Sequence, residues 1–137
     1  MPTGHKQAEA REVRTVVLDH QCGPSSHYDW MVEDPQAPAG EGLLCTWRMT
    51  VEPSRWAAAG QVELTRLGDH RRAYLTYEGE ISGGRGTVKR IDEGEATIVS
   101  WSERAAVIEV RLRAFDGRVT LQRIDGDRWV MVVGSSG

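Results

Sequence analysis

Imidazole and carboxylate groups alternate with apolar side chains in the segment His27-Tyr-Asp-Trp-Met-Val-Glu33. Successive side chains of an extended strand leave opposite faces, so we expect His27 and Asp29 on one face, together with Met31 and Glu33. The opposite, core-facing side then carries Tyr28, Trp30 and Val32. A solvated outer face would produce the same alternation, but an imidazole beside a carboxylate also supplies ligands for a divalent metal.

A second imidazole precedes this segment and is expected to meet it. His20 follows a β-branched stretch, residues 13–18, and a short glycine-proline loop returns the chain to His27. We expect His20, His27 and Asp29 to form a facial set of ligands with open positions, which suits Mn²⁺, Zn²⁺ or Fe²⁺. A rival set combines the two histidines with the thiol of Cys22, and a thiolate ligand would favour Zn²⁺.

A third histidine lies far along the chain, in Asp69-His70, four residues before Tyr74. If a strand begins at His70, residues 70, 72 and 74 share one face, so His70 and Tyr74 flank one pocket with Arg72 between them. A histidine serves as an acid, a base or a donor to a transition state, and a tyrosine hydroxyl orients a phosphate. A histidine at a strand start and a half-buried tyrosine are the simpler structural interpretation of the same residues.

Two arginines complete the set of candidate functional residues. Arg48 follows Trp47 on an expected strand, and Arg85 stands in Gly83-Gly-Arg-Gly86, where backbone amides also meet an anion. We expect both arginines to reach the pocket, while most other basic residues are ordinary surface charges. The sequence contains no nucleophile elbow, no phosphate-binding P-loop and no dinucleotide-binding fingerprint.

Short alternating segments separated by glycine-rich turns must position these residues. The expected strands are residues 13–18, 27–33, 43–49, 62–66, 74–77, 87–91, 96–101, 105–113, 118–123 and 129–133. Residues 53–60 are expected to form one short helical turn with Ser54 as its N-cap, and hairpin turns are expected at 92–94, 116–117 and 125–127. Many short strands, few helices and one small core predict an antiparallel β-barrel or a sandwich.

Length and composition restrict the function classes. The chain has 137 residues, of which 39% are hydrophobic and 27% charged, and this fits one globular domain. We assign residues 1–11 to a flexible arm, 12–133 to the domain and 134–137 to a flexible tail. The net charge of −3 excludes binding of nucleic acid by bulk charge, so such a role needs a local basic site or a metal ion.

Cysteine usage and hydrophobic patterning indicate the compartment. The two cysteines, Cys22 and Cys45, are too few for a disulfide scaffold and predict free thiols in a reducing compartment. No apolar run approaches the ~20 residues that span a bilayer, and the N-terminus lacks the apolar core of a signal peptide. We therefore expect a cytoplasmic protein that has no membrane partner.

An ordered series of short motifs resembles one known family. The series runs Asp19-His20, His27-Tyr28-Asp29 with Glu33, Leu44-Cys-Thr-Trp47, Asp69-His70 with Tyr74, Tyr77-Glu78-Gly79 with Ile81, and Gly86-Thr-Val88. In this order the motifs resemble the 3′-phosphoesterase domain of bacterial DNA ligase D and its free-standing relatives, over residues 13–130. No single motif is specific for this family, but the ordered set of motifs is much more specific than any one of them.

The resemblance implies a fold, an activity and a substrate. The family fold is a small closed antiparallel β-barrel with a polar crater, so we expect an all-β protein with one or two short helical turns. The family removes a 3′-terminal ribonucleoside and a 3′-phosphate at DNA breaks, which implies a hydrolase of DNA repair by non-homologous end joining. The implied partners are a DNA or RNA-tipped DNA 3′ end and a separate DNA ligase or polymerase.

The resemblance also assigns roles to the candidate residues. The family uses Mn²⁺, which His20, His27 and Asp29 would bind, with Zn²⁺ or Co²⁺ as other metals. His70 and Tyr74 would contact the scissile phosphate or stabilise the transition state. Arg48 and Arg85 are further catalytic candidates.

The sequence departs from the family at one phosphate-binding position. The family carries an arginine two residues after the aspartate of His-Tyr-Asp, where this chain has Met31. A thioether cannot donate a hydrogen bond, so we expect weaker activity unless Arg48, Arg72 or Arg85 compensates, and we expect Met31→Arg to raise the activity. One alternative is a barrel with little or no catalysis that binds nucleic-acid ends or a repair partner. Another is a small metalloprotein that acts on a different phosphate ester.

Overall fold

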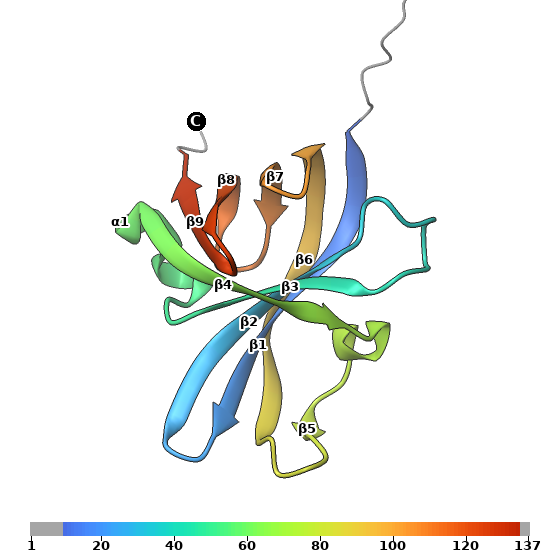
Figure 1. Cartoon of the computed structure of the whole chain (residues 1–137), viewed down its shortest axis with the longest axis vertical. Helices are drawn as coiled ribbons and strands as arrows, with labels where there is room; N and C mark the ends of the chain where they lie inside the picture. Colours follow the sequence, from blue (N-terminus) through green and yellow to red (C-terminus); the bar gives the residue numbers. More distant parts are fainter. Residues whose placement is uncertain (1–9, 135–137) are drawn as a thin grey trace, which may run out of the picture.

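The computed structural model describes residues 10–134, and strands dominate this part of the chain (Figure 1). It contains nine strands: β1 (Arg11–Cys22), β2 (Ser25–Glu33), β3 (Leu44–Met49), β4 (Gln61–His70), β5 (Gly79–Glu80), β6 (Thr87–Trp101), β7 (Ala105–Arg111), β8 (Asp116–Asp125) and β9 (Arg128–Val133). Between them lie the 3-10 helices η1 (Pro53–Arg55) and η2 (Arg72–Leu75) and the α-helix α1 (Trp56–Ala59). The predicted all-β class is confirmed, as is the short helical turn within residues 53–60.

Eight of the strands close into an antiparallel barrel, as predicted. Each strand pairs with the next in the order β1-β2-β3-β4-β9-β8-β7-β6, and β6 pairs again with β1 to complete the ring. The short strand β5 pairs with the start of β6. The long strands β1, β2 and β6 run into the lower half of the molecule, whereas β7, β8 and β9 stand in the upper half (Figure 1). The long strands thus carry residues for a second packing unit beyond the main barrel.

Alternation divides the long strands between two hydrophobic cores. The main core fills the barrel, and there Trp30 packs against Trp47 and Trp56 with ring centroids 5.6 and 5.3 Å apart. The smaller core consists of Val16, Leu18, Met31, Leu44, Leu75 and Val88. Trp30 and Met31 are neighbours in β2 but belong to different cores, because successive side chains leave opposite faces. The predicted burial of Trp30 and Val32 is confirmed, and Tyr28 is half-buried against the same core.

A chain of two buried hydrogen bonds joins the cores. The indole Nε1 of Trp30 donates to the hydroxyl of Thr15 at 2.7 Å, and this hydroxyl donates to the carbonyl oxygen of Met31 at 2.8 Å. All three residues are buried. The two bonds fix the backbone of β2 at Met31 relative to β1.

Two of the hairpin turns predicted from the sequence do not form at the predicted residues. Residues 92–94 lie inside the continuous strand β6, because long-range contacts outweigh their turn propensity. The buried carboxylate of Asp92 accepts hydrogen bonds from the backbone N–H groups of Arg113 (2.8 Å) and Ala114 (3.0 Å). Gly94 permits close strand packing, since a Cβ there would lie 1.9 Å from the carbonyl oxygen of Arg111. Residues 116–117 likewise belong to β8, and the turn precedes them.

Three further local expectations are corrected. The loop expected between His20 and His27 is a tight turn at residues 23–24, because β1 extends through Cys22 and β2 starts at Ser25. Residues 74–77 are not a strand, since η2 covers Arg72–Leu75 and buries Leu75. Ser54 is not an N-cap, because the residue before η1 is Glu52 and it makes no side-chain cap hydrogen bond.

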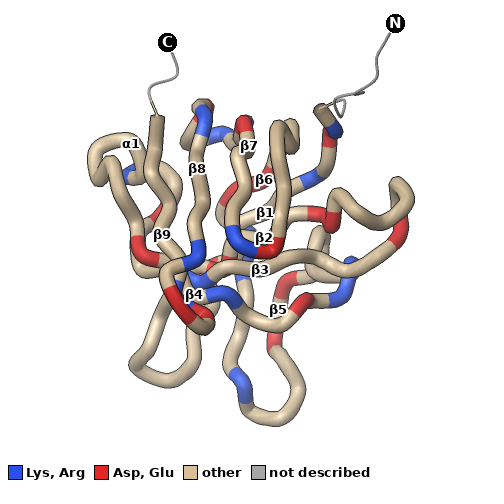
Figure 2. Tube along the Cα trace, turned by 45° about the horizontal axis from the view of Figure 1, so that its top comes forward, with Lys and Arg blue, Asp and Glu red and all other residues tan. Residues whose placement is uncertain are grey.

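Acidic and basic residues are interspersed along the strands and turns (Figure 2). Of the arm and tail expected from the sequence, residues 1–9 and 135–137 lie outside the described residues, and β1 already begins at Arg11. Across residues 10–134, no helix combines the length and the apolar character needed to cross a membrane.

Candidate functional site

A crater of about 710 Å³ opens over the smaller core. Its walls come from β1, β2, β3, the end of β4, η2 and the segment that leads into β6. It is lined by His20, Cys22, Ser25, His27, Asp29, Met31, Arg48, Asp69, His70, Arg71, Tyr74, Ile81, Gly84, Arg85 and Val88. All seven candidate site residues from the sequence therefore lie in one crater.

Strand register brings four of these residues together. β1 and β2 pair so that His20 stands directly opposite His27. β2 and β3 pair so that Asp29 stands directly opposite Arg48. Directly opposed residues on one face have Cβ atoms about 4.5–5.5 Å apart, which is close enough for their side chains to interact. The four side chains lie on the face that points away from the main core.

Asp29 is a buried carboxylate that Arg48 holds in a bidentate pair. Asp29 is only 2% exposed. Arg48 donates through Nε to Oδ1 at 2.8 Å and through Nη2 to Oδ2 at 3.1 Å. A carboxylate removed from water needs such a partner, and the planar guanidinium matches both of its oxygens. Both oxygens of Asp29 therefore accept hydrogen bonds from Arg48.

His20 is fixed through both ring nitrogens. Its Nε2 lies 2.7 Å from the carbonyl oxygen of Arg85, and its Nδ1 lies 2.9 Å from Nη2 of Arg48 and 3.5 Å from Oδ2 of Asp29. A carbonyl oxygen only accepts, so Nε2 must carry the proton of the neutral ring. The lone pair on Nδ1 then accepts from Arg48, and the guanidinium bridges His20 and Asp29.

His27 stands beside this bridge. Its ring lies edge-on to that of His20, with centroids 5.5 Å apart. Partial burial disfavours the charged imidazolium and lowers the pKa of His27 below its ordinary value of 6.5, and the positive charge of Arg48 lowers it further. The lowered pKa favours the neutral form of the ring, which offers a nitrogen lone pair.

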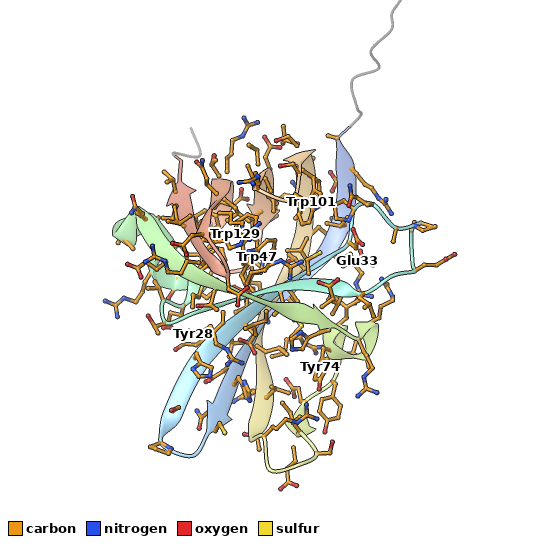
Figure 3. The ribbon with its side chains drawn as sticks, in the orientation of Figure 1. Tyr28, Glu33, Trp47, Tyr74, Trp101 and Trp129 are labelled. Carbon is orange, nitrogen blue, oxygen red and sulfur yellow. The ribbon has the colours of Figure 1, made fainter. Side chains whose placement is uncertain are left out.

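His70 and Tyr74 form the opposite wall of the crater, and their rings are edge-on with centroids 5.6 Å apart. Nδ1 of His70 lies 2.8 Å from the carbonyl oxygen of Gly68, so Nδ1 donates and Nε2 remains for a ligand. Tyr74 comes from η2 (Figure 3). Arg72 does not stand between them, as the sequence suggested, because η2 replaces the expected strand. It donates instead to Glu33 Oε2 at 2.6 Å.

The backbone and the side chain of Arg85 make different contacts at the crater. Its carbonyl oxygen faces His20, while its Nε donates to the carbonyl oxygen of Ser82 at 2.8 Å. The close approach to β1 depends on Gly86, which has a φ of +93°. A Cβ at this position would lie 2.0 Å from the carbonyl oxygen of Gln21. Gly86 therefore allows Arg85 to reach His20.

The side chain of Met31 is packed into the floor of the crater and does not project freely from its wall. It is 1% exposed and packs within the smaller core. The position at which the resembled family has a phosphate-binding arginine is thus occupied by apolar packing. Sequence reasoning missed this burial, together with the Asp29–Arg48 pair and the Glu33–Arg72 pair. Opposite charges on neighbouring strands were the signal for the Asp29–Arg48 pair, but the irregular segment 34–43 hides which residues face each other.

The three predicted metal ligands lie together but do not present a free ligand set. Both oxygens of Asp29 accept from Arg48, and Nδ1 of His20 faces the same guanidinium. Among residues 10–134, no group of three or more His, Cys, Asp or Glu side chains has the arrangement that holds a metal ion. In this arrangement, the predicted Mn²⁺, Zn²⁺ or Co²⁺ would have to displace the Arg48 guanidinium before Asp29 and His20 could bind it.

No protein-family model matches the chain, and no curated protein matches it in sequence. The resemblance to the phosphoesterase domain of DNA ligase D thus rests on the ordered motifs alone.

Proposed function

We propose that the protein binds the phosphate ester at the 3′ end of a nucleic-acid strand in the crater and hydrolyses it. One observation carries this proposal: separate parts of the chain converge on one crater. The converging residues are His20, His27, Asp29, Arg48, His70, Tyr74 and Arg85. Their resemblance to the ligase D phosphoesterase motifs supports a 3′ end as the substrate and DNA-break repair in the cytoplasm as the setting.

The local charge of the crater supports an anionic ligand. Its lining contains three arginines (Arg48, Arg71 and Arg85) against two aspartates (Asp29 and Asp69), an excess of one positive charge before any histidine is protonated. The whole chain carries a net charge of −3. A local positive field in an acidic protein attracts a phosphate at one place and repels nucleic acid elsewhere.

His70 and Tyr74 suit the work of orienting a phosphate. The carbonyl oxygen of Gly68 holds the His70 ring and leaves Nε2 for the ligand. When protonated, Nε2 donates to a phosphate oxygen that gains charge in the transition state. The Tyr74 hydroxyl donates to a second oxygen of the same group. The pair of residues therefore orients the ester on the wall opposite Arg48.

A second candidate function is binding of a 3′ end, or of a separate ligase or polymerase, without hydrolysis. The Asp29–Arg48 pair favours it, because this pair occupies the carboxylate on which metal-assisted hydrolysis would depend. Met31 favours it as well, since a buried thioether replaces a phosphate-binding cation. Hydrolysis and binding of a 3′ end both require the crater to bind phosphate, whereas binding of a protein partner does not.

A gel assay separates the two candidates. The substrate is a 5′-labelled primer–template that ends in a 3′-phosphate or a 3′-ribonucleotide, incubated with Mn²⁺, Mg²⁺ or EDTA. Hydrolysis predicts dephosphorylation or shortening, reduced by about 10²-fold to 10³-fold in His70→Ala and less in Tyr74→Phe. Arg118→Gln on β8 is the matched control, because Arg118 does not line the crater.

The outcomes are distinct. A retarded primer–template band without any product supports the binding function. A native protein that neither cleaves nor retards the substrate contradicts hydrolysis and binding of a 3′ end, and leaves only binding of a protein partner. Cleavage that is unchanged in His70→Ala removes this residue from the mechanism and leaves the crater assignment without support.

A further inference from the structure

The guanidinium of Arg48 lies where the crater offers its strongest cation-binding groups. It sits between the carboxylate of Asp29, at 2.8 and 3.1 Å, and Nδ1 of His20, at 2.9 Å. The Asp29 side chain is 3% exposed, so its negative charge is held almost entirely by this pair. Two of the three residues that the sequence suggests as metal ligands therefore already bind a cation that belongs to the protein.

A metal ion and this guanidinium exclude each other at the same place. The proton on Nε2 of His20 is fixed by the carbonyl oxygen of Arg85, so Nδ1 is the ring atom that faces Asp29. A divalent ion bound to Nδ1 and to Asp29 would stand within a few ångströms of the guanidinium. Two like charges at this distance repel each other. Arg48 would have to leave before a metal ion entered.

Arg48 also keeps part of its hydrogen-bonding capacity for a ligand. Its Nε and Nη2 bind Asp29 and His20, whereas Nη1 has no hydrogen-bond partner among residues 10–134. The side chain is 29% exposed and lines the crater. Guanidinium N–H groups bind phosphate oxygens through charge-assisted hydrogen bonds.

We propose that Arg48 takes the place of a divalent cation in this crater, so that Asp29 and His20 hold the guanidinium and the guanidinium holds the phosphate. The native chain then binds phosphate without a metal, and Mn²⁺ competes with Arg48 for Asp29 and His20. This inference goes beyond the proposed function, because it concerns which cation the crater contains. It is valid whether or not the bound phosphate ester is hydrolysed.

The first test measures the affinity for Mn²⁺ alone, from the electron paramagnetic resonance signal of the free ion. We expect weak binding by the native chain and at least about tenfold tighter binding by Arg48→Met, which frees Asp29 and His20. The gain should vanish in the double variant Arg48→Met/Asp29→Asn. Arg118→Met is the matched control, because it frees the exposed carboxylate of Glu109 by the same substitution.

The second test measures inorganic phosphate binding by calorimetry in EDTA. We expect the native chain to bind phosphate and Arg48→Met to bind it at least about tenfold more weakly. Arg48→Gln is tested alongside, because its amide still donates one hydrogen bond to Asp29 and keeps the chain folded if Arg48→Met unfolds. Circular dichroism of each variant checks the fold.

Two results would overturn the inference. The first is equal Mn²⁺ affinity in the native chain and the folded Arg48 variants, whether tight or undetectable. The second is phosphate binding in EDTA that is absent from the native chain or unchanged by loss of Arg48. Neither result depends on cleavage of nucleic acid, so failure here is distinguishable from failure of the proposed function.

Discussion

Replacing Met31 by arginine tests whether the crater floor is as closed as its packing indicates. The sequence alone suggests that Met31→Arg restores a phosphate-binding cation. The side chain of Met31, however, is 1% exposed and packs against Leu18, Leu44, Leu75 and the other members of the smaller core. We therefore expect this substitution to destabilise the fold rather than to improve the site.

The magnitude follows from two contributions. Loss of a fully buried methionine side chain costs about 1.5–3 kcal/mol of apolar burial. A guanidinium left without a partner in an apolar cluster costs about 3–5 kcal/mol more. Asp29, two residues away on the same face, is already neutralised by its pair with Arg48 and would offset this cost only in part. We expect a loss of at least about 4 kcal/mol, a large part of the roughly 5–15 kcal/mol that stabilises a domain.

Urea unfolding followed by tryptophan fluorescence measures this loss. Met31→Leu is the matched control, because a swap that keeps volume and polarity costs less than about 1.5 kcal/mol. If Met31→Arg unfolds within about 1 kcal/mol of the native chain, its guanidinium has reached the open crater, and the burial argument is wrong. Increased cleavage or phosphate binding at unchanged stability would restore the sequence-based expectation.

Three other predictions concern stability and reactivity. Thr15→Val should cost about 1–3 kcal/mol, because it leaves the buried indole N–H of Trp30 unsatisfied, and Thr15→Ser should cost less in the same urea titration. Glu33→Gln should flatten the acid side of the stability profile. Partial burial acts to raise the pKa of Glu33. Hydrogen bonds from the backbone N–H of Arg14 and from the guanidinium of Arg72 outweigh burial and bring this pKa below its ordinary value of 4.5. The stability this carboxylate contributes is thus present above pH 4.5 and lost as the pH falls through the lowered pKa, which urea midpoints at pH 7 and at lower pH will detect. Iodoacetamide should label exposed Cys22 in the native chain but label Cys45 only after unfolding, because burial raises the pKa of the Cys45 thiol to about 12, and mass spectrometry counts the adducts.

Local periodicity accounts for the part of the site that the sequence predicts. The backbone of an extended chain makes successive side chains leave opposite faces. The prediction that His27 and Asp29 lie on the face opposite to that of Trp30 therefore needs no knowledge of the partner strand. The same argument correctly gathers His20 beside His27, because a short turn joins their strands. Long-range expectations were correct where the ordered motifs constrained them, as with His70 and Tyr74 in the crater.

The parts that the sequence did not predict depend on contacts between distant segments. Asp29 meets Arg48 only through the register of β2 and β3, and no defined hairpin turn sets that register across residues 34–43. Residues around Tyr74 have strand propensity, but η2 forms there and buries Leu75 in the smaller core. Asp92 has turn propensity, yet its carboxylate satisfies backbone N–H groups of the neighbouring turn instead.

The division of β1, β2 and β3 between two faces has a consequence for how this protein can change. On each strand, one set of alternate residues builds the barrel and the other builds the crater, as Trp47 and Arg48 do on β3. A library that varies His20, His27 and Arg48 together therefore samples new ligand chemistries while the tryptophan core stays intact. Val16, Leu18, Met31 and Leu44 are the exceptions, because they pack in the smaller core on the crater side. The scaffold can thus acquire a new specificity by substitutions at alternate residues of three strands, without first acquiring compensating mutations in the barrel.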